Sequence, residues 1–242
     1  MTLQSNLWYP PAAPSLFDDE FDGSKVLETF WDLSFVVDPA APEALADFAS
    51  GNVRVGQNFP RDSWTTFQPP YDGVFRTISQ SPSPGMVVPD GFYWARVKTH
   101  FQYASISADE IAMSLFISST DSGDYDDNNH VEVYHSEADT GSIAVQFLST
   151  TDGIIGGNTT MSDLENFGQQ WEYIGILKDG NTYHHYVASS GGFWCLVGTH
   201  VWAGAAILDR FGILFGSATL NQPGNTQYGI DFFRYSPNKR LP

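Results

Sequence analysis

Two glutamates, Glu132 and Glu137, occur in the stretch HVEVYHSE, and their type and spacing raise the question of acid–base chemistry. Retaining cleavage of a bond between sugars needs two carboxyl groups about 5–5.5 Å apart, one as nucleophile and one as acid. The stretch alternates in polarity, which predicts a β-strand. Side chains of a regular strand alternate between its faces, so without a bulge the two carboxylates lie on opposite faces. We therefore expect this pair not to cooperate in catalysis.

Other residue types that could do chemistry show no useful spacing. The six histidines form no His-x-x-x-His or His-x-His pair, so a zinc site is not expected. The single cysteine, Cys195, follows Trp194 in an apolar run, and we expect a small core residue rather than a nucleophile. The sequence thus predicts a protein that is not an enzyme.

The elements that must position these residues are short strands. In GFYWARVKTHFQY, Tyr93, Ala95 and Val97 alternate with polar residues such as Arg96. The run WEYIGILKDGNTYHHYVA predicts two strands joined at Asp179-Gly180, which is a strong hairpin signal. A short helix is expected only around residues 42–48. We predict an all-β protein of two packed antiparallel sheets, because a single sheet could not bury this much apolar surface.

The composition of the chain limits the kinds of partner that it can bind. The formal charge is −17, with 28 acidic residues against 11 basic ones, and such a field would repel nucleic acid and anionic membranes. The start, MTLQSNLWYPPAAPS, lacks the basic and apolar regions of a signal peptide, and no apolar stretch approaches a membrane span.

Residues 1–16 carry Trp8 and Tyr9 among prolines, which predicts an extended arm before a single domain at 17–242.

Several stretches together resemble the concanavalin A-like lectin/glucanase superfamily. They are FDDEFDGSKVLETFWDLS, SGNVRV, DDNNHVEVY, YIGILKDGNTYHHYVASSGGFWCLVGT and YGIDFFRYS. The resemblance covers roughly residues 17–236 and is specific as a series. It implies a jelly-roll β-sandwich with a concave face, where members of the superfamily usually bind a glycan. DDNNHVEVY resembles the sugar-utilisation-regulator type of the superfamily, which belongs to its non-catalytic branch.

The catalytic glucanases of this superfamily carry Glu-x-Asp-x-x-Glu on a bulged strand. This sequence has Glu132 and Glu137 at the matching positions but Tyr134 in place of the aspartate. Tyrosine is neutral at pH 7 and cannot supply the aspartate's charge. The resemblance therefore implies that the frame of the site is present without its chemistry.

The superfamily often carries a structural Ca²⁺ on its convex side. The matching positions here are the region of Glu20, Gly51 and Asp231. The resemblance implies a candidate Ca²⁺ site that would hold the two ends of the chain together, with no part in catalysis.

A glycan site needs aromatic rings for the sugar CH faces and planar polar groups for the hydroxyls. Trp94 is the strongest candidate, since it shares the polar face of its strand with Arg96 and His100. We expect Glu132 and Tyr134 on the central strand to lie near it. The alternative is that Trp94 packs under a loop. Trp31, Trp171 and Trp194 match core or turn positions of the superfamily and are expected to be structural.

The arm also resembles the leaders of some bacteriophage virion proteins, in which a Pro-rich start runs directly into DDEFDG. We therefore expect a non-enzymatic phage tail, fibre or capsid-surface component, made in the host cytoplasm and located in the virion, which is a candidate binder of host glycans. Its arm would dock on other virion proteins, and a homo-oligomer is expected. The alternatives are a glycoside hydrolase or polysaccharide lyase of the same fold, and a cytosolic lectin-like module.

Overall fold

The computed structural model describes residues 15–19, 31–35, 54–55, 65–67, 75–82, 86–100, 111–119, 129–137, 143–151, 154–161, 171–189, 193–217, 227–239 and 241. Every regular element in these ranges is a strand, and none of them holds a helix that could span a membrane. The strands are β1 (Asp32–Phe35), β2 (Arg54–Val55), β3 (Thr65–Phe67), β4 (Phe75–Gln80), β5 (Gly91–His100), β6 (Ile111–Ser119), β7 (His130–Glu137), β8 (Ile143–Thr151), β9 (Ile154–Met161), β10 (Trp171–Asp179), β11 (Thr182–Ser189), β12 (Trp194–Val201), β13 (Leu208–Ser217) and β14 (Gln227–Ser236).

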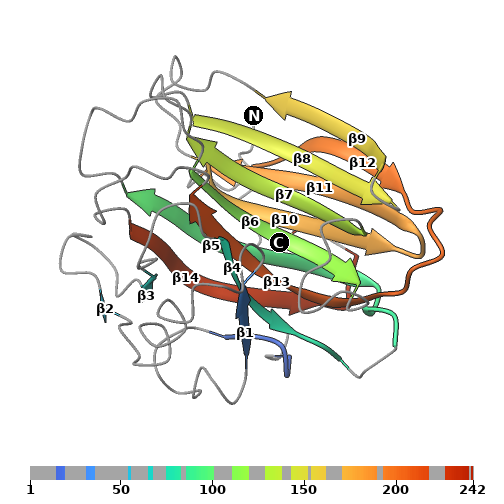
Figure 1. Cartoon of the computed structure of the whole chain (residues 1–242), viewed down its shortest axis with the longest axis horizontal. Helices are drawn as coiled ribbons and strands as arrows, with labels where there is room; N and C mark the ends of the chain where they lie inside the picture. Colours follow the sequence, from blue (N-terminus) through green and yellow to red (C-terminus); the bar gives the residue numbers. More distant parts are fainter. Residues whose placement is uncertain are drawn as a thin grey trace, which may run out of the picture.

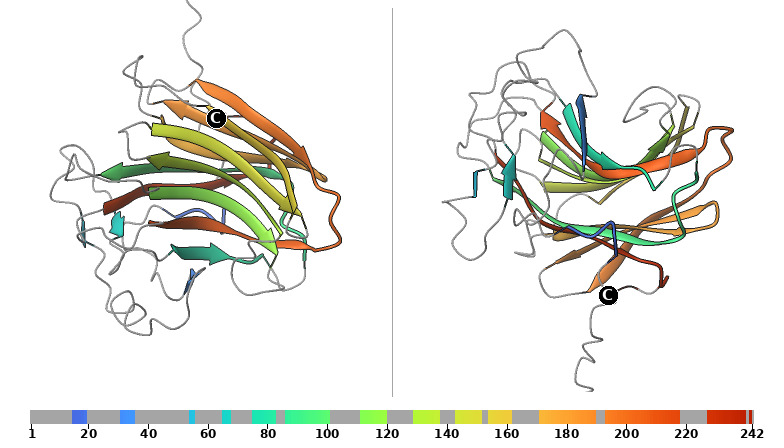
Figure 2. Two further views of the ribbon diagram at one scale, coloured as in Figure 1. Left: turned by 45° about the horizontal axis from the view of Figure 1, so that its top comes forward. Right: turned by 90° about the horizontal axis from the view of Figure 1, so that it is seen from below.

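The strands form two antiparallel sheets that lie against each other as layers (Figures 1 and 2). One, here called the β7 sheet, has the order β1-β4-β13-β6-β7-β8-β9. The other, the β5 sheet, has the order β12-β11-β10-β5-β14-β3-β2. Strands distant in sequence are neighbours in both sheets, as β4 and β13 are, which is the crossover pattern of a jelly roll. The predicted all-β sandwich of two antiparallel sheets is confirmed.

Alternation within each strand sets which side chains face the other sheet. In β5, Tyr93 and Ala95 are fully buried between the layers, whereas the intervening Trp94 is only half-buried. In β7, Val131 and Val133 enter the core and Glu132 lies between them on the outer face. The period of two that the sequence shows is therefore the period of the fold.

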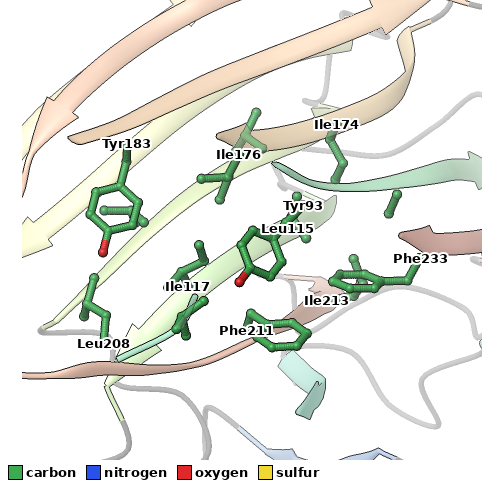
Figure 3. Close-up of a cluster of buried hydrophobic side chains, with 14 of the residues drawn as sticks. Tyr93, Leu115, Ile117, Ile174, Ile176, Tyr183, Leu208, Phe211, Ile213 and Phe233 are labelled. Carbon is green, nitrogen blue, oxygen red and sulfur yellow. The ribbon is translucent and has the colours of Figure 1, made fainter. Parts of the chain in front are cut away.

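The core lies between the two sheets and draws side chains from both (Figure 3). Phe211 of β13 contacts rings of the other sheet: its ring stacks on Phe233 at 5.5 Å between centroids and lies 5.0 Å from the ring of Tyr93. Both of these partners belong to the β5 sheet. These contacts remove large apolar surfaces from water and hold the layers together. The labelled residues of Figure 3 are Tyr93, Leu115, Ile117, Ile174, Ile176, Tyr183, Leu208, Phe211, Ile213 and Phe233.

The β10–β11 hairpin forms where the sequence predicted one, but its two-residue turn begins after Asp179 and not at it. Asp179 pairs with Thr182, so the turn consists of Gly180 and Asn181. Gly180 has φ +60°, which is the left-handed region that glycine enters without a Cβ penalty. Asp90, before β5, accepts hydrogen bonds from Lys178 Nζ at 2.6 Å and from the backbone N–H of Gly180 at 3.0 Å. The turn is therefore anchored to the neighbouring strand.

The segment around Asp19 ties the start of the described chain to its last strand. Asp19 forms an antiparallel bridge with Phe233, with hydrogen bonds of 3.0 and 2.8 Å in the two directions. Its carboxylate accepts a buried 2.7 Å bond from Trp31 Nε1, and Phe17 packs against the core. Trp31 is thus a core residue, as predicted. Trp8, Tyr9 and the helix expected at 42–48 lie outside the described residues.

Candidate functional site

The backbone of β7 decides how the two glutamates are arranged. Residues 130–137 pair with β6 on one side and with β8 on the other, and neither register shifts along this length. The strand therefore has no bulge, and an interval of five residues assigns positions 132 and 137 to opposite faces. The side chains of Tyr134 and Glu137 lie outside the description.

Glu132 is held by its neighbours on the outer face of the β7 sheet. Its side chain is nearly buried, with the residue 8% exposed, and Oε2 accepts a 2.9 Å hydrogen bond from Ser114 Oγ on β6. Nε2 of His130, two residues earlier, lies 3.7 Å from Oε1. A carboxylate with such partners contributes a satisfied polar contact to the sheet. This is the behaviour of a structural residue.

The outer face of the β5 sheet carries a different assembly. Its strands bring five large aromatic side chains into two rows that run across β14, β5, β10, β11 and β12. One row is Phe232, Arg96, Tyr173, Ala188 and Trp194, and the next is Arg234, Trp94, Gly175, Tyr186 and Leu196. We call these ten positions the aromatic face. All five aromatic residues in it are half-buried, so they have both support below and exposed surface.

Phe92 lies on the same face of β5 as Trp94 and packs against the rings of the aromatic face. It is fully buried and stacks on Trp94, with ring centroids 5.2 Å apart and 18° between the planes. Its ring also meets Trp194 edge-on at 5.0 Å and Tyr186 at 6.0 Å. Tyr173 continues the contacts, 6.2 Å from both Trp194 and Phe232. The rings therefore form one connected group from β12 to β14.

Gly175 makes this packing possible. A Cβ at this position would lie 2.5 Å from Phe92 Cζ and 3.1 Å from Trp194 Cζ3. Side chains do not tolerate such approaches without displacement. The absence of a side chain on β10 lets the rings of β5 and β12 lean over it and meet.

Two arginines are part of the aromatic face. Arg96 Cζ lies 5.7 Å from the ring centroid of Tyr173, and Arg234 Cζ lies 4.6 Å from that of Phe232. The attraction between a guanidinium and the negative face of a ring favours both placements. Nη1 of Arg234 also donates to the carbonyl oxygens of Asp19 and Phe233 at 3.5 and 3.4 Å. The face thus combines apolar rings with planar cations.

The predicted glycan residues divide between the two sheets. Trp94 and Arg96 lie on the aromatic face, and His100 ends the same strand with its side chain outside the description. Glu132 and Tyr134 belong to β7, and Glu132 lies on the outer face of the other sheet. The expectation that they lie near Trp94 is wrong, because β5 and β7 are in different layers with the core between them.

Sequence reasoning missed Tyr173, Tyr186, Trp194, Phe232 and Arg234. The resemblance implies a core or turn position for Trp194, but its side chain is half-buried on the aromatic face. Tyr173 could have been found, because it adjoins the buried Ile174 and, two residues from Gly175, lies on the same face of the strand as Gly175. Phe232 could not, because its face depends on a register shift between Ile230 and Phe232.

The structure describes only one of the three candidate Ca²⁺ positions. Glu20 and Gly51 lie outside the described residues, and Asp231 is the inserted residue of the β14 bulge. Among the residues that the structure describes, no group of three or more His, Cys, Asp or Glu side chains is placed to hold a metal ion. The site stays a prediction.

Comparison with known proteins identifies the fold. No family model and no curated protein matches the sequence. Among solved structures, a native glycosidic hydrolase matches with a TM-score of 0.54 and 16% identity, covering 96% of this chain and 100% of its own. The Bacillus licheniformis β-glucanase matches with a TM-score of 0.52 and 13% identity, covering 91% of this chain and 97% of its own.

A third structure, the GH43B protein of the xyloglucan PUL of Bacteroides ovatus, matches with a TM-score of 0.53 and 14% identity. The match covers 96% of this chain, which spans only 40% of that protein's length. Identities this low show the architecture alone. The chain has the jelly-roll β-sandwich fold of the concanavalin A-like proteins.

Proposed function

We propose that this protein is a non-enzymatic carbohydrate-binding jelly roll that binds its glycan on the aromatic face. The observation that carries the proposal is the connected group of half-buried rings at Trp94, Tyr173, Tyr186, Trp194 and Phe232. Sugar rings present CH groups that pack on aromatic faces, while their hydroxyls need planar polar partners beside them. Arg96 and Arg234 supply such partners.

The non-enzymatic part of the proposal rests on β7. A retaining glycosidase needs two carboxyl groups on either side of one bond. The unshifted register of β7 assigns positions 132 and 137 to opposite faces, and Glu132 is hydrogen-bonded to Ser114. Tyr134 replaces the intervening aspartate of the catalytic pattern. These features support binding without cleavage.

A glycoside hydrolase or polysaccharide lyase is the second candidate. It is favoured by the two fold neighbours that this chain covers almost completely, a glycosidic hydrolase and a β-glucanase. Incubation with β-glucans and alginate, followed by assay of released ends, separates the two candidates.

The finer proposal places the protein in a bacteriophage particle, as a tail, fibre or capsid-surface component. Its support is the resemblance of residues 1–16 to virion leaders, with Trp8 and Tyr9 docking on a neighbouring protein. Deletion of residues 1–16 is expected to abolish incorporation into particles while the domain stays folded. Normal incorporation of the truncated protein would overturn this proposal.

The test of glycan binding uses Trp94→Ala and Tyr173→Ala on a glycan array and in calorimetric titration of the glycans that bind. Truncation of a ring that stacks on ligand typically costs more than 1.4 kcal/mol, so each variant is expected to bind at least about tenfold more weakly. Met86→Ala is the matched control, because Met86 is 61% exposed and lies outside the aromatic face. Unchanged affinity in both aromatic variants would overturn the proposed site.

A further inference from the structure

We propose that two copies of this chain form a two-fold symmetric dimer in which β12 of one copy pairs antiparallel with β12 of the other. The pairing would extend the β5 sheet into one continuous sheet across both copies. The interface is the flank of the sandwich where β12 packs against β9, the edge strand of the other layer (Figure 1). The inference concerns assembly and goes beyond the proposed function.

β12 is the edge strand of the β5 sheet. Among the residues that the structure describes, it pairs with β11 on one side and with no strand on the other. Backbone N–H and C=O groups along the open side of an edge strand are a template for pairing with another chain. β12 has eight residues, whereas β2, at the other edge of this sheet, has two. Of the two edges, β12 therefore offers the longer template.

The sequence around β12 lacks the residues that normally protect an edge strand. No Asp, Glu, Lys or Arg occurs between Asp179 and Asp209, although 16% of the chain is charged. β12 also contains no proline, and β9 carries neither charge nor proline. Natural edge strands that must stay unpaired commonly carry lysine or proline. The flank is thus a neutral region on an acidic protein.

A bulge in β12 limits where pairing between copies can occur. Val197 is the inserted residue, between Leu196 and Gly198, and it belongs to the core. A bulge bends an edge strand and interrupts its ladder. From Gly198 to Val201 the register with β11 is regular. We assign the pairing between copies to this regular part.

Apolar side chains are exposed beside the regular part of β12. Phe193 is 81% exposed and Val201 is 62% exposed, and Leu196 and Ile207 are exposed as well. Contact with a second copy would remove such surface from water, which favours association. Exposed apolar residues gathered on one flank are typical of an interaction surface.

A second copy is the partner that this flank fits. The formal charge of each chain is −17, so two copies repel each other wherever their acidic surfaces meet. A neutral edge strand lets two copies approach with little of this repulsion. A two-fold axis also lets one strand supply both sides of the contact, which is the commonest arrangement in homo-oligomers. A cationic partner would gain nothing from an uncharged flank.

A two-fold axis perpendicular to the sheet determines which side chains meet. Tyr183, which pairs with His200, lies in the core, so Thr199 and Val201 face outward. Residues directly opposite each other in an antiparallel pair share a face of the sheet. An axis near His200 therefore places Thr199 of one copy opposite Thr199 or Val201 of the other. The aromatic faces of the two copies would lie on the same side of the continuous sheet.

The experiment introduces charge on the outward side of β12 in the full chain. The double variant Thr199→Lys/Val201→Lys places lysines of the two copies opposite each other in either register, and Thr199→Glu/Val201→Glu does the same with carboxylates. Asn238→Lys/Leu241→Lys is the matched control, because both residues are exposed and follow β14. Sedimentation equilibrium measures the mass at about 0.1 M and 0.5 M salt, where the Debye length differs about twofold.

The native chain is expected to be a dimer that tightens with salt, because salt screens the repulsion between two acidic chains. Each charged β12 variant should dimerise at least about tenfold more weakly, since like charges directly opposite each other are unfavourable. A mixture of the lysine and glutamate variants should form a heterodimer, and the control should stay dimeric. Hydrogen exchange of the 198–201 amides should slow as the dimer forms, and thermal unfolding checks that each variant is folded.

A native chain that stays monomeric at about 100 µM in both salts would overturn this inference. A native dimer that both charged variants leave intact would overturn it too, because the contact would then lie elsewhere. A charged pair that fails to form a heterodimer on mixing, or a native assembly larger than a dimer, would be equally contrary. None of these measurements involves a glycan, so their failure leaves the proposed function standing.

Discussion

Ser114 Oγ on β6 donates a 2.9 Å hydrogen bond to Oε2 of Glu132 on β7, on the side of the sheet that faces away from the core. The bond is diagonal, because the register pairs Ser114 with Tyr134 and Glu132 with Phe116. A buried carboxylate without a partner would be costly, and this hydroxyl supplies one. Glu132 therefore has a structural explanation that needs no substrate.

The first prediction concerns catalysis by Glu132 and Glu137. Glu132→Gln and Glu137→Gln are expected to leave β-glucan and alginate degradation at the background level of the native protein. Glu132→Gln should lower the free energy of unfolding by about 1 kcal/mol, because the amide oxygen still accepts from Ser114 but loses the charge-assisted bond. Ser114→Ala is the control for that bond. Turnover by the native protein that both glutamine variants abolish would contradict the prediction.

The second prediction concerns Gly175. Gly175→Ala would place a Cβ 2.5 Å from Phe92 Cζ, so the rings must move and the protein should lose about 1–3 kcal/mol of stability. Glycan affinity should fall with it, because Trp194 is displaced. Gly180→Ala is the matched control, since it strains a φ of +60° but meets no atom within 4 Å. It should cost stability, measured by urea unfolding, without weakening binding. Equal effects of both variants on binding would refute the role of Gly175.

The third prediction concerns Asp90. Burial alone would raise the pKa of Asp90, but hydrogen bonds from Lys178, the Gly180 N–H and Lys239 and the charge of Lys178 outweigh it and lower the pKa from 3.8 to about 2. A lowered folded-state pKa stabilises the protein above about pH 4, and this stability is lost as the pH falls toward 2. The side chain is 39% exposed, so solvent screening reduces the contribution to about 1 kcal/mol.

Asp90→Asn should therefore lower the free energy of unfolding by about 1 kcal/mol at pH 7, and this difference should vanish near pH 2. Urea unfolding across that range measures it. Asp179→Asn is the control, because Asp179 is exposed and pairs with Lys239 at the surface, where ion pairs contribute little. A difference between native and Asp90→Asn proteins that is constant with pH would be inconsistent with this account.

The fourth prediction concerns His185, which is fully buried on β11. Burial lowers the pKa of His185 to about 3, aided by the charges of His200 and His184 and opposed by a hydrogen bond with the Gly198 backbone. Below pH 6.5 the unfolded chain binds a proton that the folded chain does not. Stability is therefore full above pH 6.5 and falls by up to about 1.4 kcal/mol per pH unit below it.

His185→Gln should reduce that slope, measured by urea unfolding at pH 7, 6 and 5. His184→Gln should keep it, since His184 is only partly buried and contacts Thr199 Oγ1 at 3.0 Å. Identical slopes in the native and His185→Gln proteins would show that this ring does not control the pH dependence.

Several features followed from the sequence because they depend on neighbours along the chain. The alternation of Tyr93 and Trp94 assigned one to the core and the other to the outer face. Asp179-Gly180 marked the hairpin, since only a residue that tolerates positive φ fits its turn. His184 and His185 are neighbours on one strand, so alternation assigns them to opposite faces, and of the two His185 is the fully buried one.

The composition of the candidate site was decided by tertiary structure. The alternation of polar and apolar residues predicts that Trp94 and Glu132 both face outward. It does not predict that their strands belong to different sheets. The bulges near Tyr186 and Phe232 set the facing of the residues beyond them, and alternation alone does not locate bulges. The physical reason is that the direction of a side chain depends on its own strand alone. The pairing of strands joins segments that are far apart in sequence, as Trp94 and Arg234 are, and it is fixed by the burial of both sheets against a common core.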